Sequence, residues 1–376
     1  MKSNRSVNTS ELYYRESDNV YFNATITHPD GIFNSNPVVP SIGTAPIPAV
    51  FDVDNDTPFL DNSSEYYASV LRFDIPLNAV PLFICPIIPN QVNPNLTPFI
   101  IGIQNDSGPF FSQHVIYDNT SSNNLPAPIQ NQDTQVITPY YYVFSYSAFI
   151  KMINSALGLA WLSTGHALPS PYFNLDSASG LLQLIGPPDI SLPVTPTTAR
   201  IYINTALSNY LQGFDTKFLG YNQPNGRDIE FNLISNIANT EFPSAGVGWR
   251  RIYQDYVSLQ LWSSIRKLLI VSSKLPIVSE SISTGESGST RLNILTEFVP
   301  IINTLSDPRS IAYYIPHAQY RLTDMIGNRP LQAFDLRFYW QDAQDNIYPL
   351  EITIFQQINI KLGFLRKDLY KNKIDD

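Results

Sequence analysis

The sequence predicts an all-β-dominated protein, a β-sandwich body interrupted by one α+β insertion. Runs of roughly 5 to 10 residues with strand patterns, separated by turn clusters, fill most of the chain after Tyr66. Thirty prolines against 17 glycines interrupt helices, and 22 Tyr with 21 Phe favour pleated, half-buried surfaces. Strands do not alternate with long helices, and no GxGxxG or GxxxxGK[ST] motif occurs, which disfavours a doubly wound nucleotide-binding fold.

The composition favours a protein that is covered by neighbours. Only 15% of the 376 residues are charged, against about 25% in an average globular protein. Neutral polar side chains supply the polarity instead, and they can be buried with few hydrogen bonds, whereas ions need full pairing. Large contact surfaces therefore lose water at a lower cost. The net charge of −9 argues against a main role in coating nucleic acid, where a basic stripe is expected.

The ends of the chain are the only basic parts. Lys2 and Arg5 lie at the start, and four basic residues lie between Arg366 and Lys373, interrupted by Asp368. A solvated tail is the simpler interpretation, and genome contact is the alternative. Cys85 is the single cysteine, so no intrachain disulfide can form and a reducing compartment is expected. We expect neither a signal peptide nor a membrane span, because no apolar run approaches roughly 20 residues.

Residues 1 to about 65 are predicted to form an extended N-terminal arm. A strand-like stretch over 20–27 is followed by a Pro/Asn-rich run over 28–50 with almost no periodicity. Its scattered Ile, Val and Phe residues indicate an arm that docks on another surface, and a disordered terminus is the alternative. The predicted body, 66–376, then begins with five strand-like segments: 66–76, 81–87, 98–104, 112–119 and 140–146.

A compact α+β unit is predicted at about 147–220 as an insertion in this body. The clearest helix runs from Ser147 to Ser163, where apolar residues recur on one face. A hairpin follows, with its turn over 176–180, and then a strand over 199–204 and a short helical piece over 205–214. No segment before or after it has this layout.

The last third returns to strands. Over 334–340, large apolar residues at even positions alternate with Asp335, Arg337 and Tyr339, which is the period of a half-buried antiparallel strand. The small polar run Ser283 to Arg291 is predicted to be an exposed loop. The other predicted strands are 266–273, 291–301, 310–316, 348–355 and 357–366.

The residues that could carry chemistry are scattered. The histidines, His28, His114, His166 and His317, lack HExxH spacing and a cysteine partner, so zinc has little support. Cys85 lies in an apolar run, the setting of an inert thiol, and no GxSxG elbow occurs. No catalytic residue, cofactor or metal site is therefore predicted.

Two groups of carboxylates have ordinary explanations. Asp52-x-Asp54-x-Asp56 resembles the opening of a calcium loop, yet Thr57 replaces the required Gly and Ser63 the closing Glu, so a solvated turn is favoured over calcium. Asp324 and Asp335 lie near Arg321, Arg329 and Arg337, and ion pairing within a sheet or an interface is the expected role.

Several segments resemble minor capsid or penton proteins of virophages, polinton-like viruses and related double-stranded DNA viruses. The similar stretches cover roughly half of the chain and are 69–84, 140–157, 171–185 with 199–214, and 320–366. The resemblance implies a jelly-roll fold, in one copy or two, and a non-enzymatic structural subunit of an icosahedral virion. It also implies a homo-oligomer, a pentamer for a penton or a trimer for a facet subunit, that contacts a major capsid protein and is assembled in the host cytoplasm or nucleus.

Two rival functions stay open at this point. A carbohydrate- or receptor-binding β-sandwich, such as a viral fibre or lectin-like module, would use the many aromatic residues to line a sugar site, although aromatics at strand period are more often core. A glycan-active β-sandwich enzyme would need two carboxylates facing each other across a cleft, and no acidic pair stands out.

Overall fold

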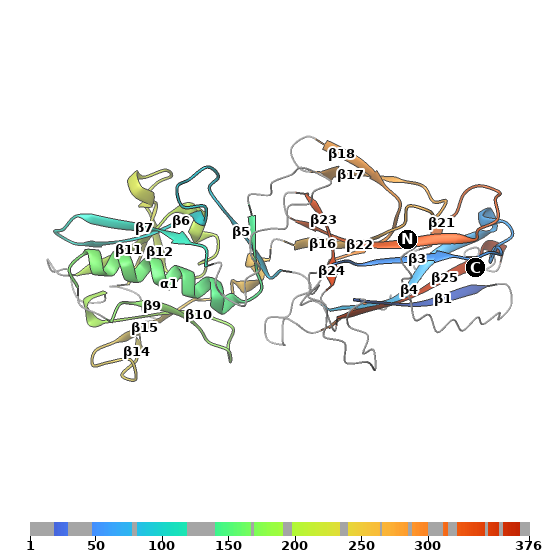
Figure 1. Cartoon of the computed structure of the whole chain (residues 1–376). Coiled ribbons are helices and arrows are strands. Elements are labelled where there is room, and N and C mark those ends of the chain that lie inside the picture. Colours follow the sequence, from blue (N-terminus) through green and yellow to red (C-terminus); the bar gives the residue numbers. More distant parts are fainter. Residues whose placement is uncertain are drawn as a thin grey trace, which may run out of the picture. The chain divides into compact units, whose positions relative to one another are not determined.

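The computed structural model of the chain contains two compact units (Figure 1). The first unit takes residues 1–80, 265–301 and 308–376, and the second takes 81–264 and 302–307. The residues that the structure describes are 19–28, 47–76, 81–118, 140–166, 169–190, 198–233, 240–263, 265–284, 288–299, 311–314, 322–342, 345–352 and 356–368.

The first unit is built from two antiparallel sheets. One sheet has the order β1-β25-β4-β20, and the other joins β3, β22, β16 and β19, with β23 also paired to β22. The strands of the first sheet are β1 (Val20–Thr27), β25 (Gln357–Arg366), β4 (Tyr66–Pro76) and β20 (Ile311–Tyr314). Those of the second are β3 (Val50–Asp54), β22 (Ala333–Asp342), β16 (Ile265–Val271), β19 (Ile294–Phe298) and β23 (Ile347–Pro349).

The strand order of this unit is that of a jelly roll. When β1, β3, β4, β16, β19, β20, β22 and β25 are counted along the chain from one to eight, the sheets read 1-8-3-6 and 2-7-4-5. This is the eight-stranded, double Greek-key arrangement of jelly rolls. The predicted fold class is therefore confirmed.

Aromatic side chains from both sheets form the centre of this sandwich. The ring centroid of Phe22, on β1, lies 5.1 Å from that of Phe334, on β22, and 5.8 Å from that of Phe364, on β25. Phe59 lies 5.8 Å from Phe334. The predicted alternation along β22 is confirmed, because its even-numbered apolar residues are almost fully buried: Phe334, Leu336, Phe338 and Trp340.

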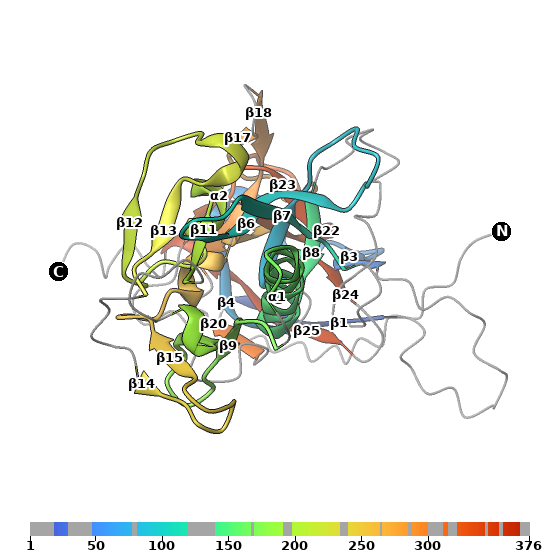
Figure 2. The ribbon, with the colours of Figure 1, turned by 90° about the vertical axis from the view of Figure 1, so that its left-hand side faces the viewer.

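The second unit places helix α1 (Tyr146–Ser163) between two antiparallel sheets (Figure 2). The predicted helix is confirmed, and its residues Phe149, Ile153, Leu157 and Trp161 are buried. The five-stranded sheet has the order β12 (Thr216–Phe218), β13 (Ile229–Phe231), β11 (Ala199–Ile203), β6 (Leu96–Asn105) and β7 (Phe110–Ile116). The four-stranded sheet has the order β14 (Thr240–Glu241), β15 (Arg250–Tyr253), β10 (Leu182–Gly186) and β9 (Tyr172–Leu175).

Short elements complete the described parts. The pairs are β5 (Phe83–Pro86) with β8 (Tyr140–Val143), β2 (Ile47–Pro48) with β24 (Glu351–Ile352), β17 (Glu280–Thr284) with β18 (Gly288–Leu292), and β21 (Thr323–Asp324) with β4. The short helices are α2 (Thr205–Ser208) and the 3₁₀ turns η2 (Ser63–Glu65), η4 (Pro188–Ile190), η5 (Pro224–Gly226) and η6 (Leu259–Trp262). None of the described helices is long and apolar enough to cross a membrane.

The unit boundaries differ from the predicted domains in two places. Within the predicted arm, β1 pairs with β25 and β3 pairs with β22, so both strands belong to the sandwich. The predicted insertion, 147–220, lies inside a longer second unit because β11 pairs with β6, about a hundred residues earlier in the chain. Pairing over such sequence distances leaves no local pattern. Whether any of residues 1–65 docks on a neighbouring subunit stays a prediction.

Candidate functional site

The histidines singled out in the sequence lie apart from one another. His28 is buried in the first unit, and the ring of His114 lies 2.9 Å from the carbonyl oxygen of Thr97 in the second. His166 stacks on Trp161, with ring centroids 4.1 Å apart. His317 falls outside the described residues. Across the described ranges, no three His, Cys, Asp or Glu side chains gather in a way that could hold a metal ion.

The acidic run at 52–56 begins inside a strand. In β3, Phe51 and Val53 are buried while Asp52 and Asp54 are exposed, so the alternate spacing of the carboxylates reflects the strand period. Asp52 lies 3.3 Å from the Nζ atom of Lys274. Cys85 is fully buried, and desolvation raises the pKa of its thiol far above the ordinary value, as in an unreactive side chain.

Asp335 is a fully buried carboxylate that fixes a loop of the first unit. It accepts hydrogen bonds from the hydroxyls of Ser272 and Ser273 and from the backbone N–H of Lys274, at 2.7 to 2.9 Å. Arg337 Nε donates to it at 2.9 Å, so the predicted ion pair is confirmed. Burial alone would raise the pKa of Asp335, but these hydrogen bonds outweigh it and lower the pKa to about 2.

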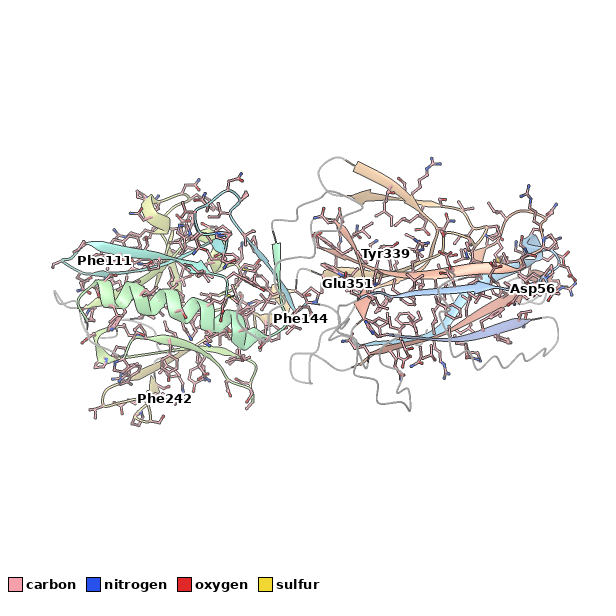
Figure 3. The ribbon with its side chains drawn as sticks, viewed as in Figure 1. Asp56, Phe111, Phe144, Phe242, Tyr339 and Glu351 are labelled. Carbon is pink, nitrogen blue, oxygen red and sulfur yellow. The ribbon has the colours of Figure 1, made fainter. Side chains whose placement is uncertain are left out.

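The outer face of the second sheet of the jelly roll also carries a small apolar cluster. Leu269, Val271 and Ile294 pack there against Ile282 from β17, and Tyr339 packs against the same cluster (Figure 3). The predicted exposed loop over 283–291 is therefore largely the β17–β18 hairpin, of which residues 285–287 lie outside the described ranges. Asp324 pairs with Lys367 and not with an adjacent arginine of the described chain.

Several charged residues line a pocket on the second unit, which we call the β11 pocket. It has a volume of about 640 Å³ and is lined by Gln104, Asp106, Arg200, Tyr202, Thr216, Lys217, Arg227, Glu230 and Asn232. Five of these nine residues are charged, against 15% of the whole chain. The strand period explains their common face: Ile201 and Ile203 point into the core, whereas Arg200 and Tyr202 point away from it.

An ion triplet forms one side of the β11 pocket. Arg200, on β11, donates from Nε to Asp106 and from Nη1 to Glu230, the latter at 2.7 Å. The two carboxylates are each only 14% exposed. Their hydrogen bonds, with that to Asp106 contributing most, raise the pKa of the Arg200 guanidinium and keep it charged. Arg200 is thus already paired with two carboxylates.

A second arginine of the lining, Arg227, lies over aromatic rings. Its guanidinium carbon lies 4.7 Å from the ring centroid of Tyr202 and 6.0 Å from that of Phe110. The Phe110 ring lies over Gly102, where a Cβ atom would come within 2.4 Å of it, so the glycine makes room for the ring. The Nε atom of Arg227 is buried and has no hydrogen-bond partner among the described residues.

The turn that carries Arg227 is tightly held. Gly226 adopts φ +76°, and a Cβ atom there would lie 2.8 Å from Ile100, so a larger residue would be both strained and crowded. The Asp228 carboxylate accepts from the backbone N–H groups of Gln223 and Thr205, at 2.8 and 2.9 Å. Burial is the largest single influence on the pKa of Asp228 and raises it. The hydrogen bonds together outweigh burial and lower the pKa below its ordinary value.

Sequence reasoning missed the β11 pocket because its charged residues come from four separate segments. Asp106, Arg200, Lys217 and Glu230 are brought together only by the pairing of β6, β11, β13 and β12. The usable signal was weak: Arg200 and Tyr202 alternate with buried apolar residues in a strand that was correctly predicted. A polar alternate face predicts solvent exposure, and it does not predict a pocket.

Comparison with known proteins adds the following similarities. A family model described as Sputnik minor capsid protein V18/19 matches residues 20–366. The chain is 29% identical over 190 residues to structural protein V19 of Sputnik virophage, a match covering 48% of this chain and 87% of V19. It is 37% identical over 136 residues to the uncharacterized protein V18 of the same virophage, covering 34% of this chain and 81% of V18.

Two solved structures are similar to nearly the whole chain. A chain in the cryo-EM structure of the Sputnik virophage has a TM-score of 0.76 and 30% identity, covering 94% of this chain and 99% of that chain. The crystal structure of the mavirus penton protein has a TM-score of 0.63 and 16% identity, covering 93% of this chain and all of that chain.

Proposed function

Because this chain belongs to the family of the Sputnik minor capsid protein V18/19, it is a structural subunit of a virus capsid, and we propose that it is the penton, which closes into a pentameric ring. The proposal that the chain is a penton rests on the structural similarity of 93% of the chain to the mavirus penton protein. That likeness reaches across both the jelly roll and the second unit.

The composition supports a ring with two different interfaces on each subunit. In a head-to-tail ring, each interface must be broad and complementary and must lose water without stranding ions. A chain with 15% charged residues and many Asn, Ser, Thr and Tyr residues meets this demand. We propose that the jelly-roll unit makes the ring contacts and that the major capsid protein borders the ring.

We also propose that the role is not enzymatic. The support is chemical: Cys85 is buried with a raised pKa, and Asp335, whose pKa is lowered to about 2, accepts several hydrogen bonds inside the first unit. A group that is enclosed in this way has no free access to a substrate. Among the described residues, no group of three or more His, Cys, Asp and Glu side chains could hold a catalytic metal ion.

Native mass spectrometry of the purified full chain tests the ring. We expect a closed pentamer that persists at moderate salt, because apolar and neutral hydrogen-bonded contacts are not screened as charge pairs are. A trimer would assign the chain to a facet in place of a vertex. A strict monomer, both free and after release from virions, would refute the ring.

A further inference from the structure

We propose that the β11 pocket binds an acidic saccharide, one whose sugar rings carry carboxylate or sulfate groups. This function would be additional to the capsid role and does not depend on the ring. The proposal rests on the size of the pocket, on the polar groups of its lining, and on two cations that lack a carboxylate partner.

Size and polarity point to a hydrated ligand larger than a single ion. About 640 Å³ lies within the range of roughly 300–1,000 Å³ found for small-molecule sites. Such sites are mostly apolar, but this pocket is lined by polar and charged side chains. Tyr202 alone contributes a large apolar surface, its ring, and Arg227 lies over that ring. A ligand that presents hydroxyl groups matches walls made of amide, hydroxyl and charged side chains.

The unpaired charge in the pocket is positive. Arg200 is engaged by Asp106 and Glu230, whereas Lys217 and Arg227 form no ion pair with any described residue. Lys217 lies opposite Glu230 in the register of β12 and β13, but no ion pair joins them. Because the chain as a whole carries −9, these two cations are a local feature and do not reflect a general attraction for anions.

Arg227 is preorganised to receive an anion. Its guanidinium group lies over the Tyr202 ring and donates from Nη2 to the Tyr202 hydroxyl at 3.4 Å, and the turn that carries it is fixed by Gly226 and by the hydrogen bonds of Asp228. A guanidinium held in this way loses little side-chain freedom when it donates to carboxylate or sulfate oxygens. Lys217, on the exposed edge strand, adds a mobile point charge.

The neutral polar side chains of the lining favour a saccharide over an acidic side chain from a neighbouring subunit. Gln104, Thr216 and Asn232 lie among the charged residues of the pocket. Their amide and hydroxyl groups can bind the hydroxyl groups of a sugar, whereas a single carboxylate would use only the two cations.

The test is isothermal titration of the full chain, in its native assembly state, with three tetrasaccharides. A hyaluronan fragment carries carboxylates, a heparin fragment carries sulfates as well, and cellotetraose is neutral. We expect binding of one or both acidic fragments and none of cellotetraose, and the stronger of the two identifies the anionic group. Changing Lys217→Ala and Arg227→Ala together should weaken binding about tenfold or more, because charge-assisted hydrogen bonds are lost.

Controls separate this result from a general loss of charge or of folding. Lys151→Ala removes an exposed cation from α1, outside the pocket, and should leave the affinity unchanged. Arg227→Lys keeps the charge but loses the planar fork, and an intermediate affinity is expected. The proposal is overturned if neither acidic fragment binds at millimolar concentration, if cellotetraose binds equally well, or if Lys151→Ala weakens binding as much as the double change. It is also overturned if the variant with both Lys217→Ala and Arg227→Ala no longer forms the ring but still binds the saccharide. The two cations would then form a contact between subunits.

Discussion

The two units of this chain use charge in opposite ways. In the jelly roll, Asp335 and Asp342 are buried and bind loop residues: Asp335 holds the turn at Ser272 to Lys274, and Asp342 accepts from the backbone N–H of Asn346 at 2.8 Å. In the second unit, charge gathers on the outer face of a sheet, in the β11 pocket. Asp335 and Asp342 in the first unit are thus enclosed by the loops they hold, whereas the charged residues of the β11 pocket, including Lys217 and Arg227, line an open cavity.

The cores of the two units differ in a similar way. In the jelly roll, Phe334 lies next to Phe22 and Phe364 of the first sheet and next to Phe51 of its own sheet. In the second unit, the rings gather around one helix: Phe149, on α1, lies 4.5 Å from Phe83 and 5.3 Å from Trp262. Each unit thus has an aromatic centre of its own, which is the condition for folding as a separate unit.

The largest expected effect tests that separation. Phe334→Ala and Phe149→Ala each remove a fully buried ring and should each cost about 3–5 kcal/mol. In differential scanning calorimetry, we expect Phe334→Ala to lower the midpoint temperature of one unfolding transition, that of the jelly roll. Phe149→Ala should lower the midpoint temperature of a different transition. The two substitutions serve as controls for each other. A single transition lowered equally by both would contradict separate folding.

The second effect concerns Asp335 and pH. Its pKa is about 2 in the folded chain and 3.8 when unperturbed, so the carboxylate stabilises the fold above about pH 4. That stabilisation, about 2 kcal/mol, is lost as the pH falls toward 2. Asp335→Asn should therefore lower the free energy of unfolding at pH 7 by about 2–3 kcal/mol, because its amide places a donor against the donors of Ser273 and Lys274.

Urea unfolding measured between pH 7 and pH 2 checks this prediction. The difference between the Asp335→Asn variant and the unchanged chain should narrow as the pH falls below 4. Asp52→Asn is the matched control, since Asp52 is the cross-strand neighbour of Asp335 but is 49% exposed. Its effect should stay under about 1 kcal/mol at every pH. A constant difference for Asp335→Asn would mean that its carboxylate charge does not stabilise the fold.

Local periodicity predicted much of the fold. The sequence correctly predicted the helix at Ser147–Ser163 and the strand at 333–342. Amphipathic patterns with periods of 3.6 and 2 residues can be recognised within a short stretch of sequence. The arrangement of the sheets was not accessible in this way. Residues 98–104 were correctly predicted as a strand, but their pairing with β11 places them in the second unit.

The sites were harder to predict than the elements. Alternation placed Asp335 on the outer face of its strand, which suggests exposure, yet the loop at Ser272 to Lys274 covers it completely. A loop that folds back over a sheet follows from tertiary structure and leaves no spacing in the sequence. The β11 pocket has the same origin, since Asp106 and Glu230 reach Arg200 only through strand pairing.

The smallest expected effect is the difference between the coupling energies of two ion pairs, one from each unit. Lys267 Nζ lies 2.7 Å from Glu297, with side chains 25% and 38% exposed, and an isolated pair of this kind contributes about 0.2–1 kcal/mol. Arg200 is similarly exposed at 27%, but it joins two carboxylates that are each 14% exposed. Double-mutant cycles with Lys267→Met and Glu297→Gln, and with Arg200→Met and Glu230→Gln, measure the two coupling energies.

We expect the coupling between Arg200 and Glu230 to be the larger, at about 1–1.5 kcal/mol, because the planar guanidinium holds both carboxylates in a less solvated place. Raising the salt to 1 M should reduce the first coupling more than the second, since the Debye length then falls to about 3 Å and screens the more exposed pair. Equal couplings with equal salt dependence would mean that the triplet is an ordinary surface contact, and that the outer face of the second unit is no more organised than that of the jelly roll.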